Sequence, residues 1–191
     1  MKQKLKLALV GAGERGQYCY APYAKMHGYE IEFVAVADPH KGRREKFVQD
    51  YHVPAEGVFE TAEQFFARPR MADAVLICTQ DSQHYAYACQ AIDLGYSILL
   101  EKPISPSARE CLDLQRRAEE KGTQIMVCHV MRYTKFYRKL KELIDSGVIG
   151  DVVHVTHTEN VAYWHYAHSY VRGNWHKTAD SSPMILAKCC H

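Results

Sequence analysis

The chain has 191 residues, of which 47% are hydrophobic and 24% are charged, and its formal net charge is +2. These values are typical of a globular protein with one domain or slightly more. The small net charge gives no basis for nucleic-acid binding, and no stretch approaches the ~20 apolar residues of a membrane span.

Strands and helices alternate along most of the chain. The predicted strands are Leu5–Val10, Ile31–Ala37, Asp73–Cys78, Tyr96–Leu100 and Gln124–Cys128. The predicted helices are Glu14–His27, Lys41–Tyr51, Thr61–Ala67, Ser82–Leu94, Ser105–Lys121 and Tyr133–Ser146. Pro22 lies inside the first of these helices and is expected to kink or shorten it. The alternation predicts an α/β fold with a Rossmann-type, doubly wound parallel sheet.

The pattern changes after residue 150. Asp151–Val161 has alternating character and predicts a long strand, an aromatic and histidine-rich stretch follows at Tyr163–Trp175, and Ser181–His191 resembles the start of a helix. One strand and one helix do not complete a domain, because a lone strand leaves its edges open. We therefore expect a Rossmann domain at 1–128 and, at 129–191, the beginning of a second α/β domain of a longer protein.

The seven cysteines are odd in number and scattered, which indicates reduced thiols in a cytoplasmic protein and not a disulfide framework. They are Cys19, Cys78, Cys89, Cys111, Cys128, Cys189 and Cys190. The terminal Cys189-Cys190-His191 lacks the C-x-x-C spacing of zinc sites, so no metal site is predicted.

The first predicted strand stops at a G-x-G-x-x-G turn, Gly11-Ala12-Gly13-Glu14-Arg15-Gly16. Gly11 allows the tight turn, Gly13 lets the backbone approach a pyrophosphate, and Gly16 lets the next helix pack closely on the strand. Phosphates would lie on the free N–H groups at the helix start. The turn, with Glu14 and Arg15 inside it, is therefore predicted to bind a dinucleotide.

Asp38 ends the second strand, 22 residues after Gly16. An acid at this place holds the adenosine ribose hydroxyls and would repel a 2′-phosphate, which favours NAD over NADP. A glycine turn combined with a helix-capping Asp would give the same pattern. Three nearby cations keep NADP open as the cofactor, namely Lys41, Arg43 and Arg44.

Glu101-Lys102-Pro103 follows directly on a buried strand. It should therefore lie at the carboxyl end of the sheet, where open α/β sheets bind ligands. A lysine there can exchange a proton with a hydroxyl, and Glu101 could orient it or bind ribose. The alternative is a solvated Glu–Lys pair, which would contribute little.

With these motifs the chain resembles the glucose–fructose oxidoreductase / inositol dehydrogenase family, Gfo/Idh/MocA. The resemblance rests on the glycine turn, Val34 through Pro39, Thr79 with His84, Gly95 through Pro103, and Arg132-Tyr133. It implies a nucleotide-binding domain followed by an α/β domain with a large open sheet, which often mediates homo-oligomerisation.

The resemblance also implies roles for individual residues. Lys102 matches the family's catalytic lysine, and His191 matches the histidine of its second catalytic motif. One of them would handle the proton while a hydride passes between nicotinamide and a carbon bearing a hydroxyl. Thr79, His84 and Glu101 would belong to the cofactor site.

The chain departs from the family pattern at three positions. Ala187 stands where the second motif usually has Asp, Gln80 replaces a usual Pro, and Val130 stands where many members have Asn. The missing Asp leaves open a second function, a dinucleotide-binding regulator without turnover.

Aromatic and hydrogen-bonding side chains between residues 163 and 175 suit a sugar or polyol substrate. Among them we single out Arg172 and Trp175 as substrate contacts. Packing in a core or an interface would explain the aromatic residues equally well.

Overall fold

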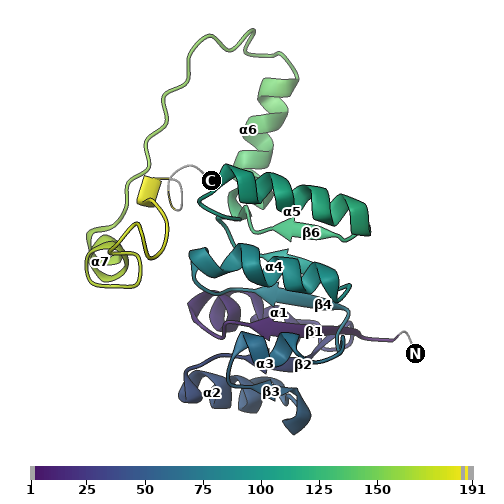
Figure 1. The fold of residues 1–191 in the computed structure, drawn as a ribbon. Coiled ribbons are helices and arrows are strands. Elements are labelled where there is room, and N and C mark those ends of the chain that lie inside the picture. Colours follow the sequence, from purple (N-terminus) through teal and green to yellow (C-terminus); the bar gives the residue numbers. More distant parts are fainter. Residues whose placement is uncertain (1–2, 186–187, 189–191) are drawn as a thin grey trace. The chain divides into compact units, whose positions relative to one another are not determined.

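A computed structural model of the chain describes residues 3–185 and 188. It consists of two compact units, the first ending at Val127 and the second starting at Cys128 (Figure 1). None of the described helices is both long and apolar enough to cross a membrane.

The first unit is built on a six-stranded parallel sheet with the order β3-β2-β1-β4-β5-β6. The strands are β1 Leu5–Val10, β2 Ile31–Ala37, β3 Val58–Phe59, β4 Ala74–Ile77, β5 Ser97–Leu100 and β6 Ile125–Val127. This order places a topological switch point between β1 and β4, as in dinucleotide-binding folds. The predicted doubly wound sheet is confirmed. The prediction lacks β3 because two residues are too few to show a period.

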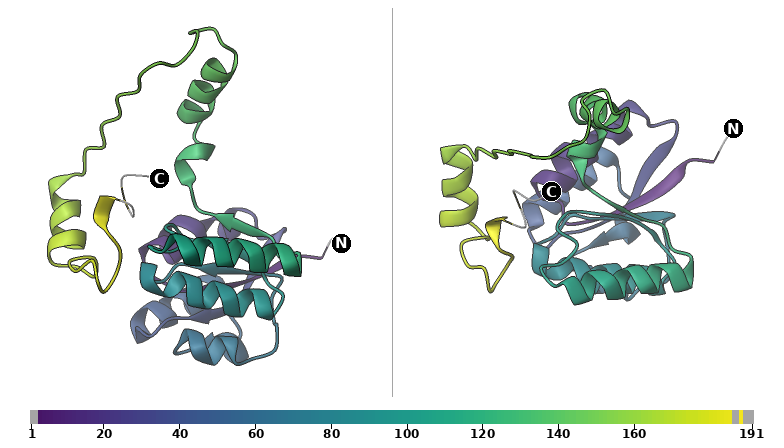
Figure 2. Two further views of the ribbon diagram at one scale, coloured as in Figure 1. Left: turned by 45° about the horizontal axis from the view of Figure 1, so that its top comes forward. Right: turned by 90° about the horizontal axis from the view of Figure 1, so that it is seen from above.

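Helices cover both faces of this sheet (Figure 2). They are α1 Pro22–Met26, α2 Lys41–Tyr51, α3 Ala62–Phe66, α4 His84–Asp93 and α5 Ala108–Lys121. Helix α5 begins at Ser107, whose hydroxyl accepts the N–H of Glu110, and ends at Gly122 in the left-handed conformation. Both are common terminal residues of helices, so its limits follow from the sequence.

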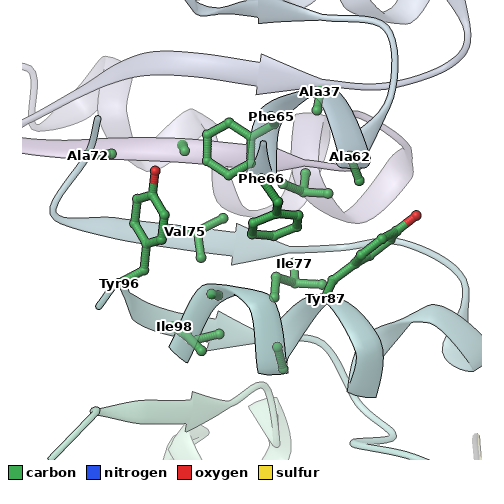
Figure 3. Packing of buried hydrophobic residues seen from close by; sticks show 14 of the residues in the cluster. Ala37, Ala62, Phe65, Phe66, Ala72, Val75, Ile77, Tyr87, Tyr96 and Ile98 are labelled. Carbon is green, nitrogen blue, oxygen red and sulfur yellow. The ribbon is translucent and has the colours of Figure 1, made fainter. Parts of the chain in front are cut away.

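Successive strand residues supply two separate hydrophobic clusters. Ala8 and Val10 face the cluster shared with α3, α4 and α5, whereas Leu7 and Leu9 face the cluster shared with α1 and α2. Figure 3 shows the first cluster, where Phe65 and Tyr96 lie over the sheet. Burial of both faces explains why the strands are continuous apolar runs in the sequence.

The predicted helix Glu14–His27 is wrong as one continuous α-helix. The structure has a π-helix over Glu14–Tyr20, followed by the short α1. Pro22 has no N–H to donate to the carbonyl four residues earlier. Directly before it, the N–H of Ala21 reaches back five residues to the carbonyl of Gly16, at 3.0 Å.

The second unit contains α6 Lys135–Asp145, α7 Tyr163–Tyr166 and a π-helical turn at Ala167–Val171. The predicted strand Asp151–Val161 is wrong, because these residues have no regular structure. Among the described residues of the second unit none forms a strand, and an extended segment needs a partner to pair its backbone groups. The predicted helix Ser181–His191 lies partly outside the described residues.

Asp113 links α5 to α4. Its carboxylate accepts hydrogen bonds from the hydroxyl of Tyr85 at 2.6 Å and from the guanidinium groups of Arg116 and Arg117 at 2.9 and 2.6 Å. These donors hold the pKa of the Asp113 carboxyl well below its usual range. An unfolded Asp titrates at about 3.9, so this carboxylate stabilises the fold above that pH and progressively less below it.

We therefore predict that Asp113→Asn lowers Tm at neutral pH and that the deficit shrinks as the pH falls below about 4. Thermal unfolding followed by circular dichroism across this range measures the effect. Asp93→Asn, at an exposed position of α4, is the control and should leave Tm unchanged. A deficit independent of pH would show that the ionised carboxylate is not what stabilises the contact.

Candidate functional site

The strand register brings four strand ends into one row. Val10 of β1 pairs with Ala37 of β2 and Ile77 of β4, and Ile77 pairs with Leu100 of β5. The residues that follow these strands therefore share the carboxyl edge of the sheet, where open α/β folds bind ligands. Those residues are Gly11, Asp38, Cys78 and Glu101.

The glycine turn lies against the end of β4. Gly11 has a φ of +95°, and a Cβ atom there would lie 2.5 Å from the carbonyl oxygen of Cys78. A Cβ on Gly16 would lie 2.4 Å from the carbonyl oxygen of Gly11. At Gly13, by contrast, the nearest atom to a Cβ would be a guanidinium nitrogen of Arg43, 4.0 Å away. The fold thus requires Gly11 and Gly16, while the space beside Gly13 is open.

Asp38 fixes the turn from the end of β2. It is only 4% exposed, and its two carboxylate oxygens accept the N–H groups of Ala12 at 2.7 Å and His40 at 2.8 Å. Arg44 donates to its backbone carbonyl at 2.6 Å. A carboxylate has about four acceptor positions, so acceptor capacity remains for ribose hydroxyls.

Glu101 is buried at the end of β5, with 6% of its surface exposed. Its Oε1 accepts the hydroxyl of Tyr20 at 2.5 Å, and its Oε2 accepts the N–H of Lys102 at 2.9 Å. The Arg15 side chain approaches Oε1 to 3.8 Å. This burial and bonding rule out a solvated Glu–Lys pair at Glu101.

His84 contacts the loop that contains Lys102, on the side of Pro103. It is 1% exposed, its Nδ1 lies 2.7 Å from the carbonyl oxygen of Pro103, and its Nε2 lies 3.2 Å from that of Thr79. The peptide bond between Lys102 and Pro103 is cis. Both ring nitrogens of His84 thus face the backbone, which favours a role in positioning the loop. Its direct contact with a cofactor stays a prediction.

The edge fits a dinucleotide. The buried hydroxyl of Thr79 has no hydrogen-bond partner among the described residues. The free space at Gly13 would admit a pyrophosphate beside the N–H groups that the start of a helix leaves unpaired. Asp38 retains acceptors for ribose, and Glu101 and Lys102 close the row at β5.

The other predicted site residues come from the later part of the chain. Arg172, which is exposed, and Trp175, whose ring centroid lies 6.4 Å from that of Tyr170, are part of the second unit and stay predictions. His191 and Ala187 lie outside the described residues. In the part of the chain that is described, no group of three or more His, Cys, Asp or Glu side chains could hold a metal ion.

Tyr20, which contacts Glu101, is not among the residues that the sequence predicts for this edge. In the sequence it is one aromatic residue of a predicted helix, without a motif around it. Its contact with Glu101 joins residues 81 positions apart, so no local pattern could reveal it.

Known oxidoreductases are similar to this chain in sequence. Residues 5–129 match the model of an oxidoreductase family with an NAD-binding Rossmann fold, GFO_IDH_MocA. The inositol 2-dehydrogenase of Pseudomonas savastanoi pv. phaseolicola is 32% identical over 157 residues, which are 80% of this chain and 46% of that protein. The scyllo-inositol 2-dehydrogenase (NADP(+)) IolW of Bacillus subtilis is 26% identical over 95% of this chain and 48% of that protein.

A solved structure of scyllo-inositol dehydrogenase from Lactobacillus casei shares the fold, with a TM-score of 0.71 and 22% identity over 79% of this chain and 44% of that one. The chain thus spans about half the length of the curated relatives that it matches.

The contrast between two glycines can be tested. We predict that Gly11→Ala destabilises the protein by about 2 kcal/mol or more, because its Cβ would meet a backbone carbonyl at a positive φ. Gly13→Ala should leave Tm nearly unchanged and weaken dinucleotide binding, because the new methyl group points into the open space. Thermal unfolding and calorimetric titration with NAD⁺ separate the two effects. Full-strength binding by Gly13→Ala would place the pyrophosphate elsewhere.

Proposed function

The chain belongs to the Gfo/Idh/MocA oxidoreductase family, and we propose that it is the dinucleotide-binding part of an NAD(P)-dependent dehydrogenase acting on a sugar or polyol. The row formed by Gly11, Asp38, Glu101 and Lys102 along one sheet edge carries this proposal. It combines a place for the phosphates, acceptors for ribose and a lysine where the substrate hydroxyl would lie.

In this proposal each residue has one task. The glycine turn and the N–H groups after it would hold the pyrophosphate, and Asp38 would hold the adenosine ribose. A bound nicotinamide supplies the hydride acceptor or donor. Lys102 exchanges the proton with the substrate hydroxyl, and its backbone is fixed by Glu101 on one side and by the bond from His84 to Pro103 on the other.

The substrate class rests on the relatives and on the second unit. The two curated relatives described above are named inositol dehydrogenases. The exposed aromatic residues Tyr163 and Trp164, with Arg172 and Trp175 after them, offer ring faces and donors of the kind that bind polyols. His191 is proposed as a second proton-transferring residue of the whole protein, which we expect to form homo-oligomers.

The alternative is a dinucleotide-binding regulator, which Ala187 at the family's Asp position favours. Turnover separates the two functions. We predict that the full-length protein reduces NAD⁺ with a sugar or cyclitol and that Lys102→Ala lowers kcat by at least about a hundredfold. Lys121→Ala, at the exposed end of α5, is the matched control and should keep kcat.

Absorbance of the reduced nicotinamide at 340 nm follows this turnover across a panel of polyols. Dinucleotide binding without turnover on any of them would favour the regulator. Full activity of Lys102→Ala would remove the lysine from the mechanism.

Cofactor choice can be tested separately. The buried carboxylate of Asp38 should repel a 2′-phosphate, so we predict that NAD⁺ binds at least about tenfold more tightly than NADP⁺. The guanidinium of Arg43, whose nitrogen lies 4.0 Å from a Cβ placed on Gly13, is a candidate for attracting the additional phosphate. Calorimetric Kd values for both dinucleotides, on the native protein and on Arg43→Ala, measure this balance. Tighter binding of NADP⁺ by the native protein would contradict the role given to Asp38.

A further inference from the structure

The π-helix after the glycine turn is the least ordinary element of the first unit. It spans seven residues, Glu14–Tyr20, and closes with the bond from the Ala21 N–H to the Gly16 carbonyl. π-Helical turns are rare and occur frequently at functional sites. With a hydrogen bond to the fifth residue back, each residue turns through a smaller angle than in an α-helix. The last side chains of the segment therefore point in directions that α-helical winding would not give.

One of these side chains reaches the carboxyl edge of the sheet, where Glu101 lies. The hydroxyl of Tyr20, the last residue of the π-helix, donates to Glu101 Oε1 at 2.5 Å. Tyr18, two residues earlier, is 56% exposed. The two tyrosines lie on the same π-helix and carry the same hydroxyl group, but only the hydroxyl of Tyr20 contacts the buried carboxylate of Glu101.

Glu101 passes this contact on to Lys102. The backbone N–H of Glu101 donates to the carbonyl of Ile77 at 3.0 Å, so Glu101 is anchored to β4. The hydroxyl of Tyr20 on Oε1 then leaves Oε2 directed at the N–H of Lys102, at 2.9 Å. The orientation of one carboxylate therefore determines whether the backbone N–H of Lys102 keeps this hydrogen bond.

Arg15 does not replace this contact. Its Nε lies 3.8 Å from the same oxygen, and its side chain is 54% exposed. At that distance it attracts the carboxylate without fixing its rotation. The short hydrogen bond from Tyr20 supplies the direction.

We propose that Tyr20 is a positioning residue for Lys102, acting through Glu101, and that the π-helix is the means by which its hydroxyl reaches that carboxylate. This inference deepens the proposed dehydrogenase function and rests on it for the catalytic consequence. The positioning itself is a property of the protein without cofactor. It can therefore be measured whether or not turnover is found.

Tyr20→Phe keeps the ring and removes the hydroxyl, and Tyr18→Phe is the matched control on the same helix. The first measurement is the backbone amide resonance of Lys102 in ¹H–¹⁵N spectra of the cofactor-free protein. We expect it to shift in Tyr20→Phe and to stay in place in Tyr18→Phe. The shift should be largely absent when Tyr20→Phe is added to Glu101→Gln, because the contact that carries it has already been altered.

The second measurement is steady-state kinetics with the polyol that the native protein oxidises. We expect Tyr20→Phe to lower kcat about tenfold, as for the loss of one hydrogen bond to a charged group, with KM for the dinucleotide nearly unchanged. Tyr18→Phe should keep both values.

An unmoved Lys102 amide in folded Tyr20→Phe would overturn the inference, and so would equal shifts from Tyr20→Phe in the native and Glu101→Gln proteins. Failure of the native protein to bind any dinucleotide would refute the proposed function instead, and it would leave the amide result to decide on the positioning.

Discussion

The contact between the turn after β1 and the end of β4 is the constraint on which the site depends. Gly11 lies so close to Cys78 that a single Cβ atom would come within 2.5 Å of its carbonyl oxygen. This approach seats the turn against the end of β4, while the space beside Gly13, two residues further along the chain, is open. Asp38 then fixes the turn from the other side, through the N–H of Ala12.

Contacts between the segments that follow β1, β4 and β5 complete this edge. The carboxylate of Glu101 accepts the hydroxyl of Tyr20 and the N–H of Lys102, and the two ring nitrogens of His84 lie 2.7 and 3.2 Å from the carbonyl oxygens of Pro103 and Thr79. The segments that follow β1, β4 and β5 are thereby joined by hydrogen bonds. A lysine held in this way has a fixed backbone before any ligand arrives, which reduces the reorganisation that proton transfer would require.

The sequence predicted those parts of the site that depend on local chemistry. The glycine turn, Asp38 at a strand end and the apolar strands are each determined by residues close together in the chain. The π-helix was not predictable in this way, because Pro22 indicates a break in the helix but not that the N–H of Ala21 bonds to the carbonyl of Gly16. The strand predicted at Asp151–Val161 is absent, because an alternating pattern alone does not supply a strand to pair with. The position of Lys102 at the carboxyl end of a strand follows from the sequence. The contact of Tyr20 with Glu101, the residue before Lys102, joins segments far apart in the chain and does not.

The roles given to these residues require that a dinucleotide binds along the edge from Gly11 to Lys102. Titration of the ¹⁵N-labelled protein with NAD⁺ tests it most directly. We expect the largest amide shifts on residues 11–16, Asp38, Thr79 and Glu101, with little change along α5 and β6. Saturable shifts centred on α5 and β6, or no shifts at millimolar NAD⁺, would contradict it.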